Sequence, residues 1–95
     1  MAENRIKEPG RWQLRHAAGS YWLLDMLQGP ESRKPPFSMN QAGAEIWGFL
    51  QQGMREEAVA EQLSSRYQIE RERALADVRG FVAGLEAQGV VIVKD

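Results

Sequence analysis

The chain has 95 residues, 43% hydrophobic and 26% charged, and its 12 basic and 13 acidic side chains leave a formal net charge of −1. This length supplies one core, the apolar fraction excludes a wholly disordered chain, and the balanced charge argues against a dedicated nucleic-acid binder. There are no cysteines, and His16 is the only histidine, which excludes disulfides, thiolate metal sites and two-histidine sites within one chain. Composition therefore favours a binding module over an enzyme, with no metal and no cofactor.

The first ten residues are polar and end in Pro9-Gly10, without a helical or strand period. They predict a flexible N-terminal arm over residues 1–10, followed by a single domain over residues 11–95. No run approaches the ~18 apolar residues of a membrane span, and no apolar stretch follows the first charges as in a signal peptide. We therefore expect a cytoplasmic protein without a membrane partner.

Two short runs separated by a break of small residues come next. Apolar and polar side chains alternate over residues 12–17, and residues 21–27 form an aromatic and aliphatic run. The intervening Ala18-Gly19-Ser20 predicts a β-hairpin. Its turn is centred either on Ala18-Gly19 or on Gly19-Ser20, and the two choices pair opposite faces of the strands.

Residues 28–36 concentrate glycine, three prolines and charge, which predicts a loop. A short third strand is expected from Pro36 to Met39. Because proline is tolerated mainly at an edge or at the first residue of a strand, this strand should border the sheet with one side unpaired. Such an edge is a place where another chain could add itself.

Helical periodicity predicts three helices over about 41–51, 55–66 and 71–88. Their apolar stripes are Ala42, Ile46, Phe49 and Leu50 with Trp47 beside them on the first helix, Val59, Leu63 and Tyr67 on the second, and Ala74, Val78, Phe81 and Leu85 on the third.

The ends of these helices carry further signals. Asn40 is an N-cap for the first helix, whereas Arg55 stands where Ser or Thr would cap the second. Gly53 and Gly89 are expected to end the first and third helices. Residues 90–93 are expected to form a short strand or an extended tail. This order predicts an α+β domain of the winged helix-turn-helix type, an N-terminal three-stranded antiparallel sheet followed by three helices.

From Leu23 to Val90 the residues resemble the PqqD-like family of precursor-peptide recognition proteins, with coverage of roughly residues 21–91. The resemblance rests on the order and spacing of Leu23-Leu24-Asp25, Met39-Asn40, Ala44-Glu45-Ile46-Trp47, Leu50, Gly53, Val59-Ala60, Leu63, Tyr67, Ile69-Glu70, Asp77-Val78, Leu85 and Gly89-Val90.

The resemblance implies a non-catalytic winged-helix domain, a RiPP recognition element. Such an adaptor binds the leader segment of a ribosomally synthesised precursor peptide and presents it to a separate enzyme, such as a radical SAM enzyme, a cyclase or a protease. In the family the leader adds as an antiparallel strand to the third strand and lies in the groove between that strand and the third helix. Carried over by position, the peptide-binding residues are Phe37, Ser38, Met39, Arg71, Ala74, Leu75 and Val78.

The sequence departs from the family pattern in its third strand and second helix. The connection formed by residues 28–36 is longer than is usual in the family. Pro35 and Pro36 remove backbone donors from the third strand, to which the leader would add. Helix two starts at Arg55 without the usual Ser or Thr. The similarity to stand-alone members that serve lasso-peptide pathways is at least as close as that to quinone-cofactor members, so the pathway stays open, as does the choice between monomer and homodimer.

Several residues have both a functional and a structural interpretation. Arg71, with Arg73 and Arg79, could pair with acidic leader side chains or form a solvated face on which Arg73 pairs with Asp77. Phe37 and Met39 could line a pocket or belong to the core.

Other residues divide in the same way. Gly80 and Gly84 form a smooth strip on the third helix. It is either a contact surface for a partner or a second copy of the chain, or an exposed surface without a binding role. His16 is expected to serve packing or a surface hydrogen bond, and Trp12, Trp22 and Trp47 to anchor the sheet and helices.

A winged-helix DNA-binding regulator is the competing function. Helix three would then enter the major groove of DNA. Because its acidic residues outnumber its arginines, phosphate attraction would be poor and nucleic acid is the less favoured partner.

Overall fold

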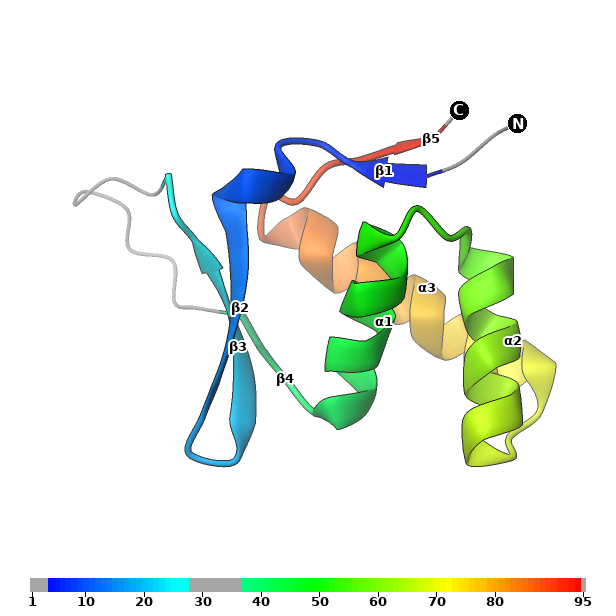
Figure 1. The fold of residues 1–95 in the computed structure, drawn as a ribbon. Coiled ribbons are helices and arrows are strands. Elements are labelled where there is room, and N and C mark those ends of the chain that lie inside the picture. The colour runs from blue at the N-terminus through cyan, green and yellow to red at the C-terminus, as the bar shows by residue number, and fades with distance from the viewer. Residues whose placement is uncertain (1–3, 28–36, 95) are drawn as a thin grey trace.

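The computed structural model describes residues 4–27 and 37–94. A three-stranded antiparallel sheet in the order β2-β3-β4 lies on one side of the molecule, the three helices lie on the other, and β1 and β5 form a separate two-stranded ribbon (Figure 1). The predicted fold class is confirmed. The elements are β1 (Asn4–Ile6), the short 3-10 helix η1 (Pro9–Arg11), β2 (Trp12–Ala17), β3 (Ser20–Asp25), β4 (Phe37–Met39), α1 (Gln41–Gln51), α2 (Glu56–Tyr67), α3 (Arg71–Ala87) and β5 (Ile92–Lys94).

The hairpin of β2 and β3 closes with a two-residue turn. Ala17 pairs with Ser20, which settles the open register in favour of a turn centred on Ala18-Gly19. Ala18 and Gly19 have φ values of 54° and 77°, the combination that a type I′ hairpin turn requires and glycine adopts without steric cost. The same register turns Trp22 away from the helices, and its side chain is only partly buried.

His16 serves packing at the far end of this hairpin. It lies opposite Tyr21 in the register, and the two rings stack with their centroids 4.3 Å apart. The structure thus supports the packing interpretation of the single histidine.

The first helix begins at the residue that the sequence indicates. The Asn40 side chain accepts a hydrogen bond from the Gly43 N–H at 2.9 Å, which satisfies one of the free donors of the first turn. Arg55 makes no such side-chain cap on α2. Gly89, at φ 104°, follows the end of α3 in a conformation that a side chain would strain.

The core lies between the sheet and the helices. Trp47 of α1, Leu23 of β3 and Val78 of α3 are among its most deeply buried side chains. Val82 also belongs to it, although the predicted stripe omits it, whereas Tyr67 at the end of α2 is 42% exposed and Phe81 only half-buried. None of the described helices has the length and apolar composition of a membrane span.

The prediction of an arm without regular structure is wrong for residues 4–6 and 9–10. Asn4–Ile6 forms β1, which pairs antiparallel with β5 in the register Ile6 to Ile92, and Ile6 is 8% exposed. A three-residue strand is too short to show a period, and its partner lies at the other end of the described chain. Residues 1–3 and the predicted loop 28–36, with Pro36, lie outside the described residues.

Candidate functional site

Strand β4 forms an edge of the three-stranded sheet. It pairs with β3 alone, Met39 opposite Tyr21 and Phe37 opposite Leu23, and no other described strand lies on its second side. The predicted position of this strand at the border is confirmed. An edge strand offers backbone N–H and C=O groups to an added chain, and three residues make this one short.

Helix α3 lies beside this edge and contacts it through one aromatic side chain. The rings of Phe37 and Phe81 meet edge to face with centroids 5.9 Å apart. Gly84, one turn further along α3, lies so close that a Cβ atom there would be 3.4 Å from the Phe37 ring. The C-terminal half of α3 is therefore the part that borders β4.

Helix α1 completes this corner through a glycine. A Cβ atom at Gly43 would lie 2.9 Å from the Met39 Cβ and 3.0 Å from Cε1 of Phe81, closer than ordinary packing permits. The missing side chain lets α1 approach β4 and α3 together. The relative positions of the strand and the helix are thereby fixed by close packing.

The contact with Phe37 identifies the side of α3 that faces the open edge. Successive helical residues are rotated by about 100°, which places three further residues within about 40° of Gly84 around the helix axis. Each of the three is exposed, and a Cβ atom at Gly80 would meet nothing within 4 Å. We define the β4–α3 surface as the open backbone edge of β4 at Phe37 and Ser38 and the Phe37 ring, with Arg73, Asp77, Gly80 and Gly84 of α3.

The structure brings only part of the predicted peptide-binding set to this surface. Phe37 is half-buried, whereas Met39, at 7% exposure, belongs to the core. Ser38 is exposed, but it pairs with Trp22, so its side chain lies on the face of the sheet turned away from the helices. Ala74 and Val78 are fully buried, so their side chains are not accessible to a ligand.

Arg71 and Leu75 lie on sides of α3 that are turned away from Gly84 and β4. Leu75 is rotated by about 180° from Gly84, and Arg71 points toward α2, where its Nη2 lies 3.4 Å from Oε1 of Glu61. Position along the sequence does not specify the side of a helix, so the carried-over segment Arg71–Val78 includes residues on several sides of α3.

The residues that sequence reasoning missed are Phe81 and Gly84 as neighbours of β4, and Asp77 on the same side of α3 as Gly84. One signal was available, since Gly80 and Gly84 stand out in the sequence as a smooth strip on a helix that tolerates glycine poorly. Of these two glycines, Gly84 is covered by Phe37 of the same chain, whereas Gly80 is open.

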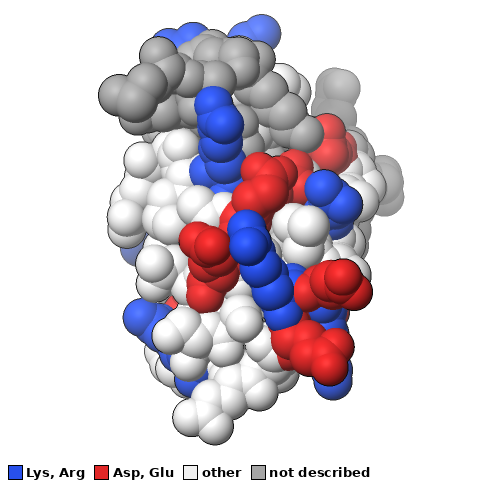
Figure 2. Space-filling view, turned by 90° about the vertical axis from the view of Figure 1, so that its right-hand side faces the viewer, with Lys and Arg blue, Asp and Glu red and all other residues white. Residues whose placement is uncertain are grey.

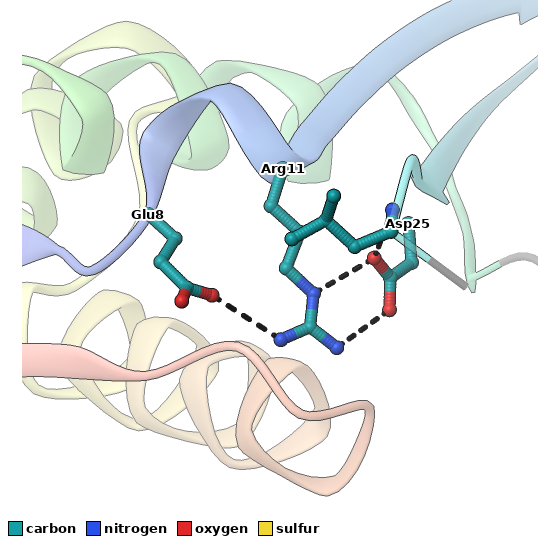
Figure 3. A network of polar contacts seen from close by, with 4 residues as sticks. Glu8, Arg11 and Asp25 are labelled. Carbon is teal, nitrogen blue, oxygen red and sulfur yellow. Dashed lines mark hydrogen bonds and ion pairs between the residues drawn. The ribbon is translucent and has the colours of Figure 1, made fainter. Parts of the chain in front are cut away.

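A polar clamp fixes the end of β3, from which the chain leads toward β4 (Figure 3). The Arg11 guanidinium donates from Nε and Nη2 to the two Asp25 oxygens at 2.7 Å each, and its Nη1 lies 3.3 Å from Glu8. The hydrogen bonds to Asp25, with help from Glu8, raise the pKa of Arg11. Asp25 also accepts from the Leu27 N–H at 3.0 Å, so the residues just after β3 are held to η1.

A second polar cluster joins α1 to α2. Glu45 accepts from Arg66 at 2.5 Å and from the Tyr67 hydroxyl. The Tyr67 hydrogen bond, and next the Arg66 guanidinium, hold the pKa of Glu45 below its usual value, while the same bond to Glu45 and desolvation raise the pKa of Tyr67. The cluster ties the two helices together away from the β4–α3 surface.

The Glu45 cluster predicts a pH dependence of stability. Because the pKa of Glu45 is lower in the folded state, its contribution is present above its usual value of 4.5 and is lost as the pH falls through the lower folded value. Tyr67 titrates in the opposite sense, so its contribution is present below pH 10.0 and is lost as the pH rises beyond its raised pKa.

Urea unfolding midpoints of the wild type and Glu45→Gln across this range measure the effect. We expect the difference between the two proteins to be largest near neutral pH and to shrink at both extremes. A difference that stays constant with pH would contradict the assignment.

Among residues 4–27 and 37–94, no three His, Cys, Asp or Glu side chains come together to hold a metal ion. The described chemistry of the β4–α3 surface is an open strand edge, an apolar ring and two charged side chains.

Comparisons with known proteins address the family and the fold of the chain. No curated protein sequence matches the chain significantly. Among solved structures, TbiB1 in complex with the TbiA(beta) leader peptide has a similar fold, with a TM-score of 0.71, 22% identity and coverage of 90% of this chain and 92% of that chain. A lasso peptide synthetase B1 complexed with the leader peptide matches with a TM-score of 0.73, 25% identity and coverage of 96% and 98%.

The family comparison covers more than half of the chain. Residues 26–91 match the family described as coenzyme PQQ synthesis protein D, PqqD. These residues include β4, the three helices and therefore every residue of the β4–α3 surface. The chain belongs to the PqqD family.

Proposed function

We propose that the chain is a non-catalytic adaptor that binds the leader segment of a ribosomally synthesised precursor peptide. The leader adds as an antiparallel strand to the open edge of β4 and lies along the facing side of α3. The observation that carries this proposal is the edge strand itself, which has a free side within reach of an exposed helix face. Main-chain hydrogen bonds to such an edge supply affinity, and alternate side chains supply selectivity.

The comparisons support a peptide as the ligand. Both similar structures are described with a leader peptide bound, and one of them matches over nearly the whole length of both chains. The match to the PqqD family covers the strand and the helix that the proposal uses. The binding residues in this chain are Phe37 and Ser38 on the strand and the Arg73, Asp77, Gly80 and Gly84 side of α3.

Delivery to a second protein completes the proposed role. A domain that only holds a leader serves an enzyme encoded separately, and a radical SAM enzyme, a cyclase or a protease is the class of partner we propose. The bound leader would leave the following part of the precursor free for that enzyme. The proposal places this step in the cytoplasm, where ribosomes release precursor peptides.

The described charges of α3 disfavour the alternative of DNA binding. Arg71 and Arg79 are directed to glutamates of α2, at 3.4 Å from Glu61 and 3.7 Å from Glu56. On the side of the molecule where α2 lies, acidic and basic side chains are intermixed (Figure 2). A surface of this kind lacks the continuous positive potential that attracts a phosphate backbone.

Amide chemical shifts of the labelled protein test the proposal. The probe is a synthetic leader from the nearest small precursor-like reading frame, and a DNA duplex is the control. We expect saturable shifts at Phe37–Met39 and Asp77–Gly84 with the peptide alone. Shifts confined to β2, the other edge of the sheet, would contradict the site, and salt-sensitive shifts on α3 with DNA alone would contradict the function.

A further inference from the structure

The three arginines of α3 differ in what surrounds them. Arg71 and Arg79 lie on the side that faces α2, and each forms an ion pair with one of its glutamates. The guanidinium groups of Arg71 and Arg79 therefore have carboxylate partners within the same molecule, although exposed ion pairs of this kind are weak. Arg73 stands between them in sequence and on a different side of the helix.

Arg73 is exposed and forms no ion pair with any other residue in the part of the chain that the structure describes. The expected pair with Asp77, four residues later, does not form, although Asp77 is also exposed and likewise makes no ion pair with a described residue. The two charges on this side of α3 therefore differ from Arg71 and Arg79, whose partners lie on α2.

The position of these two charges relative to β4 follows from helical geometry. Arg73 and Asp77 are rotated by only about 20° from Gly84, the glycine that touches the Phe37 ring. They continue the β4–α3 surface along α3 away from that contact. Arg73 precedes Gly84 by eleven residues, a rise of about 16 Å, which corresponds to about five residues of an extended chain.

The spacing of the two charges matches that of an extended chain. Four helical residues rise about 6 Å, and two strand residues about 6.8 Å, so side chains of a strand two positions apart face Arg73 and Asp77 in turn. A strand laid along α3 thus meets a positive charge at one position and a negative charge at its next same-face position.

We propose, resting on the proposed function, that Arg73 is the side chain of α3 that selects an acidic residue of the leader. Asp77 disfavours an acidic residue two positions away on the same face, which fixes where along the leader the acidic residue is accepted. A carboxylate accepts two parallel hydrogen bonds from a guanidinium, which gives Arg73 a geometric as well as a charge preference. Arg71 has no part in this selection, because it faces α2.

Selection from a display library of random linear peptides tests this assignment. The baits are the wild type, Arg73→Glu and the matched control Arg71→Glu, which carries the same charge change two residues away. We expect wild-type peptides to share an acidic residue at a fixed distance from an apolar anchor. Arg73→Glu should select a basic residue at that position, while Arg71→Glu selects the wild-type pattern.

Single peptides then give the size of the effect. Exchanging the selected acidic residue for glutamine should weaken binding to the wild type about threefold to fivefold, the range of an exposed ion pair, and leave binding to Arg73→Gln unchanged. Equal losses with both proteins, or a charge preference that follows Arg71, would overturn the assignment of Arg73 and leave leader binding standing. If no peptide selected with the wild type shifts the amide signals of β4, the proposed function is overturned, and this inference with it.

Discussion

Replacing Gly80 by tryptophan should raise the dissociation constant for the leader about 30-fold or more, a loss of about 2 kcal/mol, without unfolding the protein. Gly80 is exposed in the interior of α3, and a Cβ atom there meets nothing within 4 Å. A bulky ring at this position would cover the β4–α3 surface next to Phe37, where the added strand has to lie. Since glycine is a poor helix former, the melting temperature should stay the same or rise slightly.

A tryptophan at Ala83 is the matched control. Ala83 is also small and exposed on α3, but it is rotated by about 100° from Gly84, away from β4. Isothermal titration of both variants with the same synthetic leader separates the two positions. Wild-type affinity in a folded Gly80→Trp protein, or an equal loss in Ala83→Trp, would show that the peptide does not lie along this side of α3.

Replacing Gly43 by valine should lower the free energy of unfolding by about 3 kcal/mol and the melting temperature by more than about 10 °C. The added Cβ atom would lie 2.9 Å from the Met39 Cβ and 3.0 Å from Cε1 of Phe81. Both neighbours are held by their own packing, so α1 would have to move away from β4 and α3. Gly43→Ala should cost less, because alanine recovers about 1 kcal/mol of helix propensity.

Gly48→Ala provides the control for Gly43 in the same helix. A Cβ atom at Gly48 meets nothing within 4 Å, so this substitution should raise the free energy of unfolding by up to about 1 kcal/mol. Urea denaturation of the three variants measures the differences. Destabilisation of similar size at Gly43 and Gly48 would mean that the contact with Met39 and Phe81 does not decide the outcome.

Features that depend on neighbours in sequence could be predicted well. The Asn40 cap, the ends of the helices and the edge position of β4 each follow from a local rule for one residue type. The register of the hairpin could not be chosen, because Ala18 had to adopt a positive φ that alanine rarely takes. The conformational cost at Ala18 is tolerated because this register directs the apolar face of β3 toward the core.

The orientation of α3 could not be read from its periodicity. An apolar stripe shows which side of a helix is buried, but the two flanking sides look alike until their neighbours are known. Arg71 and Arg73 lie only two residues apart, yet one faces Glu61 of α2 and the other continues the β4 side. Position within a family motif indicates the strand and the helix, but it does not indicate which side of the helix faces β4.

The pairing of β1 with β5 has a consequence for how the chain assembles. Joining Ile6 to Ile92 closes a loop of nearly the whole described chain, whereas β2, β3 and β4 pair through much nearer segments. Long loops cost the most entropy to close, so the ribbon is expected to form after the hairpin and helices have collapsed. During synthesis on the ribosome, β1 can therefore pair only after β5 has been made.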